Sequence, residues 1–204
     1  GSGGGRAAGA LAARGGSRWM FAPANDPTVC GEGFFVSGQP GYWRPSIGNG
    51  EVRNDASHGY HNAFESTFSE WNSFFENHAD SSDYGFWLGY SRGNSVRRNT
   101  VLGSRSDGIA IEHGSENDIG ANVIIGARTA IHLFAPGDNK EPSQGYRIDD
   151  NTLARAGRGI LLEHTSKVRL RGNVFAGVEV GLVTESYESD ALIQGTFVRR
   201  VRGW

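Results

Sequence analysis

Asparagine recurs along this chain at a nearly constant interval, and no other feature restricts the fold as strongly. Six asparagines are separated by 23, 22, 23, 29 and 22 residues, and four others precede the first four of them by five positions. The longer series is Asn54, Asn77, Asn99, Asn122, Asn151 and Asn173, and the shorter is Asn49, Asn72, Asn94 and Asn117. A period of this length is typical of a solenoid, in which each turn buries its apolar face only by stacking on its neighbours.

A segment with strand character follows each asparagine of the longer series. About eight to nine residues after the asparagine, a small residue is followed by alternating apolar positions, and such alternation directs one set of side chains inward and the other outward. The predicted inward set is Phe64, Phe86, Ile109, Ile131, Ile160 and Leu182, with Leu88, Ile111, Leu133 and Leu162 two residues further on. A second short strand is predicted at residues 73–75, 95–97, 118–120, 147–149 and 169–171.

Two or three short strands per turn, joined by bends rather than helices, predict an all-β fold. We expect a right-handed parallel β-helix solenoid of about seven coils, with 22–23-residue repeats and an internal ladder of asparagine side chains. Asparagine suits the bends because it tolerates the left-handed backbone region and can hydrogen-bond its own turn. Leucine-rich and helical repeats require patterns that this sequence does not contain.

The repeat divides the chain into two parts. Residues 1–30 carry the weakest repeat, so we expect an irregular N-terminal segment or cap, of which residues 1–5 resemble an artificial linker. The strand pattern resumes at Gly33–Val36, which predicts a β-helix domain over residues 31–204. Two insertions, at 37–45 and 135–143, lengthen the interval, and such insertions often wall a binding groove at one edge of a solenoid.

Composition restricts the partners. A net charge of −2 and a pI near 6.3 give no electrostatic reason to expect nucleic acid. The sequence contains no run of 18 apolar residues and no intact signal peptide, so we expect no membrane partner. The single cysteine, Cys30, excludes an internal disulfide and a CxxC metal cage, and we expect the protein to be a monomer.

Three segments resemble the bacterial right-handed parallel β-helix repeat proteins: YGFWLGYS at 84–91, NSVRRN at 94–99 and GIAIEHG at 108–114. That superfamily includes polysaccharide lyases, mannuronan C5-epimerases, some glycoside hydrolases and a periplasmic protein of copper-enzyme maturation. The resemblance spans about residues 31–200 and implies an extracellular or periplasmic location and a polysaccharide partner. The Asp-Pro-His motif of the epimerases does not occur in this sequence.

The outward residues of the predicted strands suggest a site. Glu112 and Glu163 are expected about 10 Å apart, two rungs of about 4.8 Å each, which is at the upper end for an inverting glycosidase and therefore favours proton abstraction over hydrolysis. The acid–base candidates are His58, Tyr60, His61, His132, Glu112 and Glu163. The substrate-binding candidates are Trp87, Glu65, Tyr42, Trp43, His113, His164 and Arg128, with Arg92 and Arg105 as further cations for a uronate carboxylate.

Two functions remain open. One is a lyase or epimerase that acts on an acidic, uronate-containing polysaccharide. The alternative is a non-catalytic glycan-binding or structural β-helix module of a larger extracellular protein, in which Trp87, Trp43 and Tyr42 contact the sugar.

The cofactor is undetermined. We consider calcium, with Asp149 and Asp150 as oxygen ligands. Five other residues have metal-ligating side chains but no diagnostic spacing, so no metal site is predicted: Glu112, His113, His132, Glu163 and His164.

Overall fold

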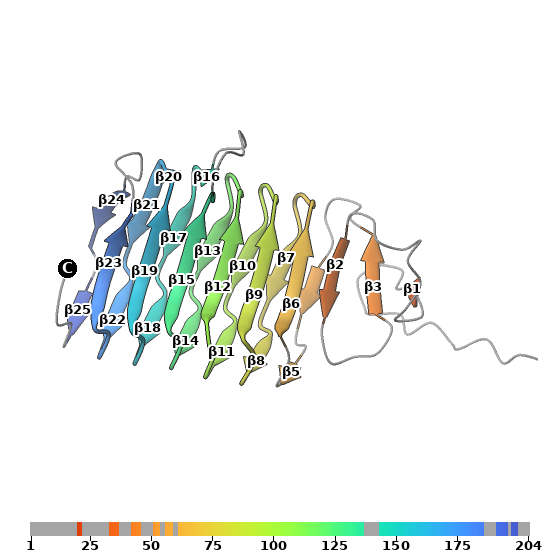
Figure 1. The fold of residues 1–204 in the computed structure, drawn as a ribbon, viewed down its shortest axis with the longest axis horizontal. Helices are drawn as coiled ribbons and strands as arrows, with labels where there is room; N and C mark the ends of the chain where they lie inside the picture. The colour runs from red at the N-terminus through yellow and green to blue at the C-terminus, as the bar shows by residue number, and fades with distance from the viewer. Residues whose placement is uncertain are drawn as a thin grey trace, which may run out of the picture.

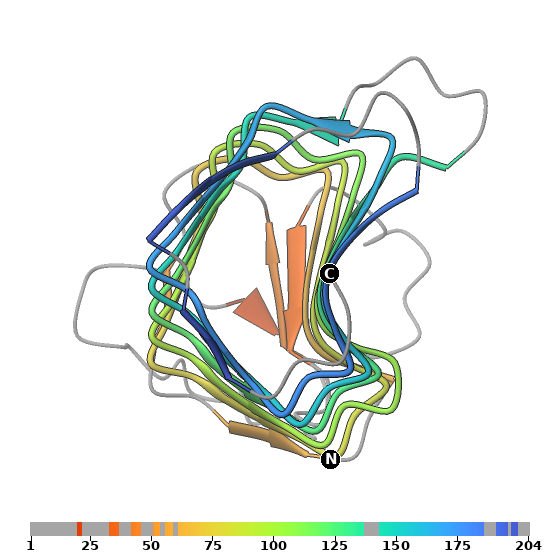
Figure 2. The same cartoon turned by 90° about the vertical axis from the view of Figure 1, so that its left-hand side faces the viewer.

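The chain forms a right-handed parallel β-helix (Figures 1 and 2). The computed structural model describes residues 20–21, 33–36, 42–45, 51–53, 56–58, 61–136, 143–185, 191–195 and 197–199, with side chains in 52–53, 61–136, 143–185 and 191–195. Every regular element within these ranges is a β-strand. The predicted fold class is therefore confirmed.

Three sheets run along the solenoid, here called A, B and C. Sheet A contains, in spatial order, β1 (Met20–Phe21), β3 (Tyr42–Pro45), β2 (Gly33–Val36), β6 (Asn62–Thr67), β9 (Tyr84–Gly89), β12 (Asp107–Glu112), β15 (Thr129–Phe134), β19 (Arg158–Glu163) and β23 (Val180–Thr184). Sheet B contains β24 (Ala191–Gln194), β21 (Val168–Arg171), β17 (Arg147–Asp149), β13 (Asp118–Gly120), β10 (Ser95–Arg97), β7 (Ser73–Phe75) and β4 (Glu51–Arg53). Sheet C contains β25 (Phe197–Arg199), β22 (Val174–Ala176), β18 (Thr152–Ala154), β14 (Val123–Ile125), β11 (Thr100–Leu102), β8 (His78–Asp80) and β5 (Ala56–His58). A pair of two-residue strands, β16 (Ser143–Gln144) and β20 (Thr165–Ser166), lies at the bend between sheets A and B.

The coils number about six rather than the expected seven. They begin at β6, β9, β12, β15, β19 and β23, each of which pairs in parallel with the next. Strand β2 forms where the repeat predicted a strand, but it runs antiparallel to β6, and β3 occupies part of the predicted insertion at 37–45. These N-terminal strands therefore add no parallel coil, and the predicted domain boundary at residue 31 falls outside the described residues.

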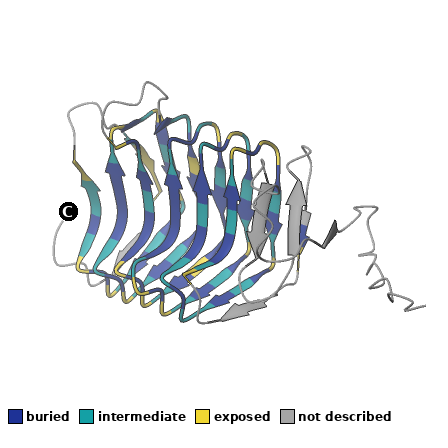
Figure 3. Cartoon of the chain, turned by 45° about the vertical axis from the view of Figure 1, so that its right-hand side comes forward, coloured by how far each residue is buried: buried dark blue, intermediate teal, exposed yellow. Residues whose placement is uncertain are grey.

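The core is a continuous stack of apolar side chains inside the three sheets (Figure 3). All the predicted inward residues are fully buried except Leu182, which is partly buried against the core. Phe64 and Phe86 stack with their ring centroids 4.8 Å apart, and Phe74 meets Phe86 edge to face at 5.7 Å. Strand alternation in the sequence thus identifies the inward face correctly.

The small residue at the start of each sheet A strand is explained by crowding from sheet C. A Cβ atom on Gly85, Gly108 or Gly159 would lie about 2.5 Å from a side-chain atom of Val101, Ile124 or Phe175 respectively. Where sheet C carries Ala79 in the first coil, sheet A has room for Ala63. Small and large side chains thus alternate across the coil, as close packing requires.

Two asparagine ladders mark the bends on either side of sheet B. In the longer ladder, the backbone N–H of each asparagine donates to the side-chain oxygen of the next, from Asn77 through to Asn173, at 2.9–3.0 Å. Each side-chain amide also donates to a backbone carbonyl of the preceding coil, as Asn122 does to Val96 at 2.8 Å. The predicted ladder is confirmed.

The conformational reason given for asparagine was wrong. The residue with positive φ is the one before the asparagine, as in Glu76, Arg98 and Asp150, and the asparagine amide bonds to neighbouring coils rather than to its own turn. Asparagine is therefore selected because its amide carries both a donor and an acceptor that reach the adjacent rungs. The shorter ladder ends at Asn117, and the buried Tyr146 occupies its position in the next coil.

Candidate functional site

The outer side of sheet A, here called the A face, presents columns of side chains between β6 and β23. In register, the central column is Glu65, Trp87, Ala110, His132, Leu161 and Val183. The column nearer the C-terminal ends of the strands is Thr67, Gly89, Glu112, Phe134 and Glu163. This arrangement confirms that the residues predicted to point outward share one face.

The middle of the A face is shielded from solvent although its side chains point away from the core. Ala110 and Leu161 are 0% and 1% exposed, and neither belongs to the internal cluster. The wall formed by sheet A also bows inward in cross-section (Figure 2). Polar groups on this face therefore interact in a partly desolvated environment, where electrostatic contacts are stronger than in water.

A continuous aromatic strip crosses the A face. His61 meets Tyr84 edge to face at 5.4 Å, and Tyr84 meets Trp87 at 4.8 Å. Trp87 then meets Phe134 at 5.8 Å, and Phe134 stacks on His132 at 4.4 Å. We name these five residues the aromatic strip; they come from the coils of β6, β9 and β15 and extend across the coil of β12, which contributes no ring.

His132 lies between two carboxylates. Its Nδ1 is 3.0 Å from Asp107 Oδ2 and its Nε2 is 3.4 Å from Glu163 Oε2. The second contact is within ion-pair distance but lacks hydrogen-bond geometry, so Nε2 is buried without a hydrogen-bond partner among the described residues. Asp107 thus orients the ring, and Glu163 covers the nitrogen that a substrate would need to reach.

The other carboxylates of the A face have different surroundings. Glu65 accepts hydrogen bonds from Asn62 Nδ2 at 2.8 Å and from Thr67 Oγ1 at 3.3 Å, which occupies both of its oxygens. Glu112 is half-buried and lies beside Phe134, with Glu163 on the rung beyond, so the predicted two-rung separation of Glu112 and Glu163 is present in the register. Phe134, rather than His132, lies between them in that column.

A polar edge borders the A face at the bend from sheet C. His61 Nδ1 lies 2.8 Å from Asp83 Oδ2, and Arg105 Nε donates to Asp83 Oδ1 at 2.5 Å. Hydrogen bonds from Arg105 and His61 hold the pKa of Asp83 below its usual value. Arg128 donates to Ser106 Oγ at 3.1 Å on the same edge. The polar edge therefore begins at His61, the first residue of the aromatic strip, and includes Arg128, whereas Arg92 lies at another bend, bonded to Glu116.

Two predicted sugar-binding histidines lie at bends rather than on the A face. His113 and His164 directly follow β12 and β19, and both have φ of 49°. His113 is buried and stacks on Tyr90 at 4.9 Å, and Tyr90 stacks on Phe68 at 4.9 Å. The structure does not bring either residue to the strip. The side chains of His58, Tyr60, Tyr42 and Trp43 lie outside the described residues.

Sequence reasoning missed three members of this site: Asp107, Tyr84 and Phe134. Asp107 and Tyr84 immediately precede the small residue of their strands, a position that was not counted as outward. Phe134 was placed outward without a role. A search of the position before each small residue would have found the first two.

The described residues offer no metal centre. They contain no group of three or more His, Cys, Asp or Glu side chains able to hold a metal ion. Asp149 and Asp150, considered above for calcium, instead face arginines: Asp149 lies 2.8 Å from Arg169, and Asp150 4.0 Å from Arg171. The expectation of calcium therefore finds no support.

Together the ladder, the three parallel sheets and an outward site define a parallel β-helix repeat protein whose chemistry lies on one face. The chain belongs to the NosD family, described as periplasmic copper-binding protein, which matches residues 29–201. This family agrees with the predicted extracellular or periplasmic location and with the predicted resemblance to β-helix repeat proteins. The match does not support the more specific resemblance to polysaccharide lyases and epimerases.

One solved structure resembles the chain distantly, the surface protein and adhesin PfbA of Streptococcus pneumoniae. The match has 8% identity and a TM-score of 0.37, and it covers 76% of this chain and 66% of that chain. A match this distant supports no conclusion about the function of the chain. No curated protein matches the chain significantly.

The described side chains do not provide the ligands expected for the copper ion named in the family description. Copper sites in proteins are built mainly from imidazole, thiolate and thioether ligands. Within the described side chains, the centre of the A face offers one imidazole, His132, with a carboxylate beside each nitrogen. His61 lies at the edge, bonded to Asp83, and the other histidines lie on bends or in sheet C. We therefore derive no chemistry through copper.

The described residues also include no helix long and apolar enough to cross a membrane.

Proposed function

We propose that this protein is a non-catalytic carbohydrate-binding β-helix, and that it binds a neutral or amine-bearing glycan on the A face. The observation that carries the proposal is the aromatic strip, which runs across four coils. Aromatic rings present an apolar surface with a polar rim, and this combination suits the apolar face of a sugar ring.

The charge of the A face selects the kind of glycan. Its described outward residues include four carboxylates, Glu65, Asp107, Glu112 and Glu163, and one guanidinium, Arg158. Repulsion by these carboxylates disfavours a uronate polymer in a partly desolvated setting. A neutral sugar, or one with a protonated amine, meets no such penalty.

The same geometry argues for binding rather than catalysis. A lyase requires a base that reaches the proton on C5 and a cation that neutralises the uronate carboxylate. His132 Nε2 is buried against Glu163, and both oxygens of Glu65 already accept hydrogen bonds. His132 and Glu163 thus contact each other, and Glu65 is held by Asn62 and Thr67.

The proposal is tested by titrating the full chain with neutral, amine-bearing and uronate oligosaccharides and following tryptophan fluorescence. We expect neutral or amine-bearing sugars to bind and Trp87→Ala to weaken that binding at least tenfold, since truncation of a central aromatic anchor typically costs about 2 kcal/mol or more. Trp71→Ala is the matched control, because Trp71 is exposed at a bend away from the A face.

Two results would contradict the proposal. One is that Trp87→Ala and Trp71→Ala bind every sugar as well as the unaltered protein does. The other is the appearance of unsaturated ends, detected by ultraviolet absorbance, when uronate polymers are incubated with the protein. That second result would restore the lyase hypothesis, and loss of the signal in His132→Ala would place its site on the A face.

A further inference from the structure

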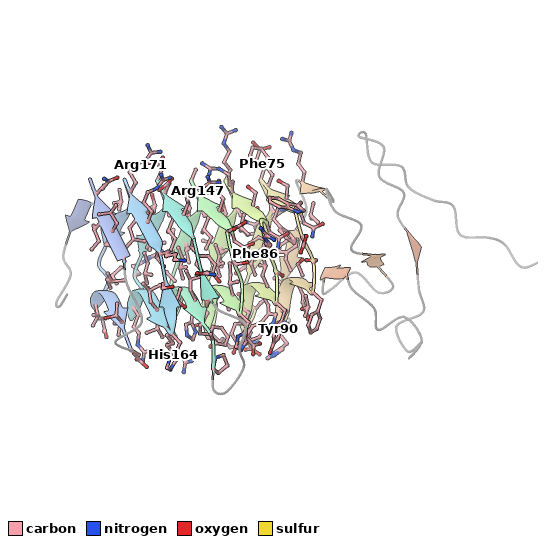
Figure 4. The ribbon with its side chains drawn as sticks, turned by 90° about the horizontal axis from the view of Figure 1, so that it is seen from above. Phe75, Phe86, Tyr90, Arg147, His164 and Arg171 are labelled. Carbon is pink, nitrogen blue, oxygen red and sulfur yellow. The ribbon has the colours of Figure 1, made fainter. Side chains whose placement is uncertain are left out.

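The outer side of sheet B carries a line of arginines that the A face does not explain. Arg97, Arg147, Arg169 and Arg171 project from β10, β17 and β21, and we name this group the arginine face. Figure 4 shows Phe75, Arg147 and Arg171 along one edge of the solenoid, opposite Tyr90 and His164. The arginine face and the A face are thus formed by different sheets of the same coils.

Two carboxylates lie beneath these guanidinium groups. Arg97 Nη1 donates to Asp118 Oδ2 at 2.7 Å, and Arg169 Nη2 donates to Asp149 Oδ2 at 2.8 Å. Arg147 approaches Asp118 at 3.5 Å and Arg171 approaches Asp149 at 3.8 Å. Arg171 Nη2 also lies 4.0 Å from Asp150 Oδ2, so four cations share three anions, which leaves a local excess of one positive charge.

The depths of these groups place the excess charge at the surface. The side chains of Asp149 and Asp118 are 7% and 19% exposed, whereas those of Arg147 and Arg171 are 56% and 57% exposed. A guanidinium carries five N–H donors, and the contacts to Asp118 and Asp149 use only one or two on each arginine. Arg169 Nε is buried without a hydrogen-bond partner among the described residues, whereas Arg147 and Arg171 are more than half exposed and keep donors that a ligand can reach.

Neighbouring rungs repeat the same charge. Arg147 and Arg169 are register partners on adjacent parallel strands, about 4.8 Å apart at the backbone. Like charges at such positions repel each other and destabilise the pair. A ligand with regularly spaced anions would relieve this repulsion and accept the outward donors.

The cationic line continues toward the N-terminal coils. Arg53 and Arg98 lie over the ring of Phe75, at 4.4 Å and 5.0 Å from its centroid. Arg97 lies close over Gly120, where a Cβ would come within 2.5 Å of its guanidinium carbon. Glycine at this position makes room for Arg97 to reach Asp118.

We propose that the arginine face binds an anionic polysaccharide, one that bears carboxylate or sulfate groups, along the axis of the solenoid. Bidentate guanidinium donors match both anions, and arginines on the adjacent strands β17 and β21, with Arg97 two rungs before β17, match a linear polymer with repeated charges. The chain's net charge of −2 disfavours nucleic acid as the general partner. This site is independent of the neutral-glycan site proposed for the A face.

The test is affinity electrophoresis of the full chain in gels that contain dextran sulfate, pectate or unmodified dextran. We expect retardation by the two anionic polymers, weakened at least tenfold in Arg147→Gln/Arg169→Gln and reduced by added salt. Arg155→Gln is the matched control, because Arg155 is exposed on a bend outside the arginine face. Circular dichroism establishes that each variant is folded. Glutamine removes the positive charge of arginine and keeps a polar hydrogen-bond donor.

Three outcomes would overturn the proposal. The first is that the double variant is retarded as strongly as the unaltered protein. The second is that Arg155→Gln weakens the retardation as much as the double variant does. The third is that the protein binds vesicles of anionic phospholipid or single-stranded DNA but neither anionic glycan. The variant Trp87→Ala keeps the two proposals separate, since it should lose neutral-sugar binding and retain retardation by dextran sulfate. Failure of one site therefore leaves the other testable.

Discussion

The A face and the arginine face are built on the same coils, yet they have opposite character. On the A face, carboxylates stand among aromatic rings, and only Arg158 supplies a cation among the outward residues described. On sheet B, carboxylates lie beneath a layer of guanidinium groups. The inward residues of both sheets are mainly apolar, and Ser66 on β6 is a buried polar exception. In a β-helix, the core fixes every second residue and leaves the outward columns free to acquire a function.

The depth of the acids decides the sign of each surface. Asp149 is nearly covered by Arg169 and Arg171, so its charge serves to anchor cations. Glu112 and Glu163 remain half-buried on a face with little positive charge, so their charge is available to a ligand. Composition alone conceals this difference, because the net charge of −2 is a sum over the whole chain.

The largest expected effect comes from the asparagine ladder, and it tests whether both faces depend on the alignment of successive coils. Asn122→Ala removes the bonds to Val96 and Asn151 and the acceptor for the backbone N–H of Asn99. Several buried polar groups lose partners, at about 1–3 kcal/mol each, so we expect urea unfolding to show a loss of about 3 kcal/mol or more. Binding at both faces should weaken together.

Val123→Ala is the control for that experiment, because Val123 is the next residue and is exposed. Its effect should stay within about 0.5 kcal/mol. If Asn122→Ala impaired only one face, the two sheets would not be coupled through the ladder.

An intermediate effect compares a buried acid from each face. Asp107→Asn disturbs the contact to the half-buried His132, whereas Asp149→Asn disturbs contacts to exposed arginines that water can replace. We expect a loss of about 1–3 kcal/mol for the first and under about 1 kcal/mol for the second. If the two variants lost equal stability in urea unfolding, the solvent exposure of His132 and of the arginines would not explain a difference between the two faces.

The smallest effect comes from the interior that the faces share. Burial raises the pKa of Tyr146 above its usual value, so its neutral form is the folded form. An unfolded tyrosine ionises near pH 10, so the protein should lose stability as pH rises above about 10, by about 1.4 kcal/mol at pH 11, and should show no change from this group below that range. Urea unfolding between pH 8 and 11 measures the slope.

Tyr146→Phe supplies the comparison, because it removes the titrating hydroxyl, which lies 3.0 Å from Ser143 Oγ, and keeps the ring. Its stability should be flatter over the same pH range. An unchanged slope would assign the loss to groups other than Tyr146.

The sequence predicts the fold well because the constraints on it are local and repeated. Strand alternation identifies Phe86 and Ile109 as inward, and the spacing of Asn99 and Asn122 gives the length of the coil. The exceptions are instructive. Strand β2 matches the repeat pattern in residues 33–36, yet it runs antiparallel, since the pattern specifies which side chains are buried and not the direction of pairing.

The site was predictable only in part. Trp87, His132 and Glu163 were expected on one face and are found there. The pairing of His132 with Asp107 depends on a contact between residues 25 positions apart in sequence and on a strand position that alternation does not mark as outward. The arginine face was missed for a similar reason, because arginines scattered between residues 97 and 171 become neighbours only when the coils stack.

The asparagine ladder also governs how the length of such a protein can change over evolution. Each rung aligns its amide with the next at a spacing of 22 or 23 residues, so gain or loss of one whole coil leaves every remaining amide with a partner. A single-residue insertion within a strand would shift the amides out of line in all later coils. The 29-residue interval from Asn122 to Asn151 keeps the ladder intact because the additional residues lie between Phe134 and Tyr146, at the bend where β16 pairs with β20. Change in length is therefore confined to complete repeats and to bends.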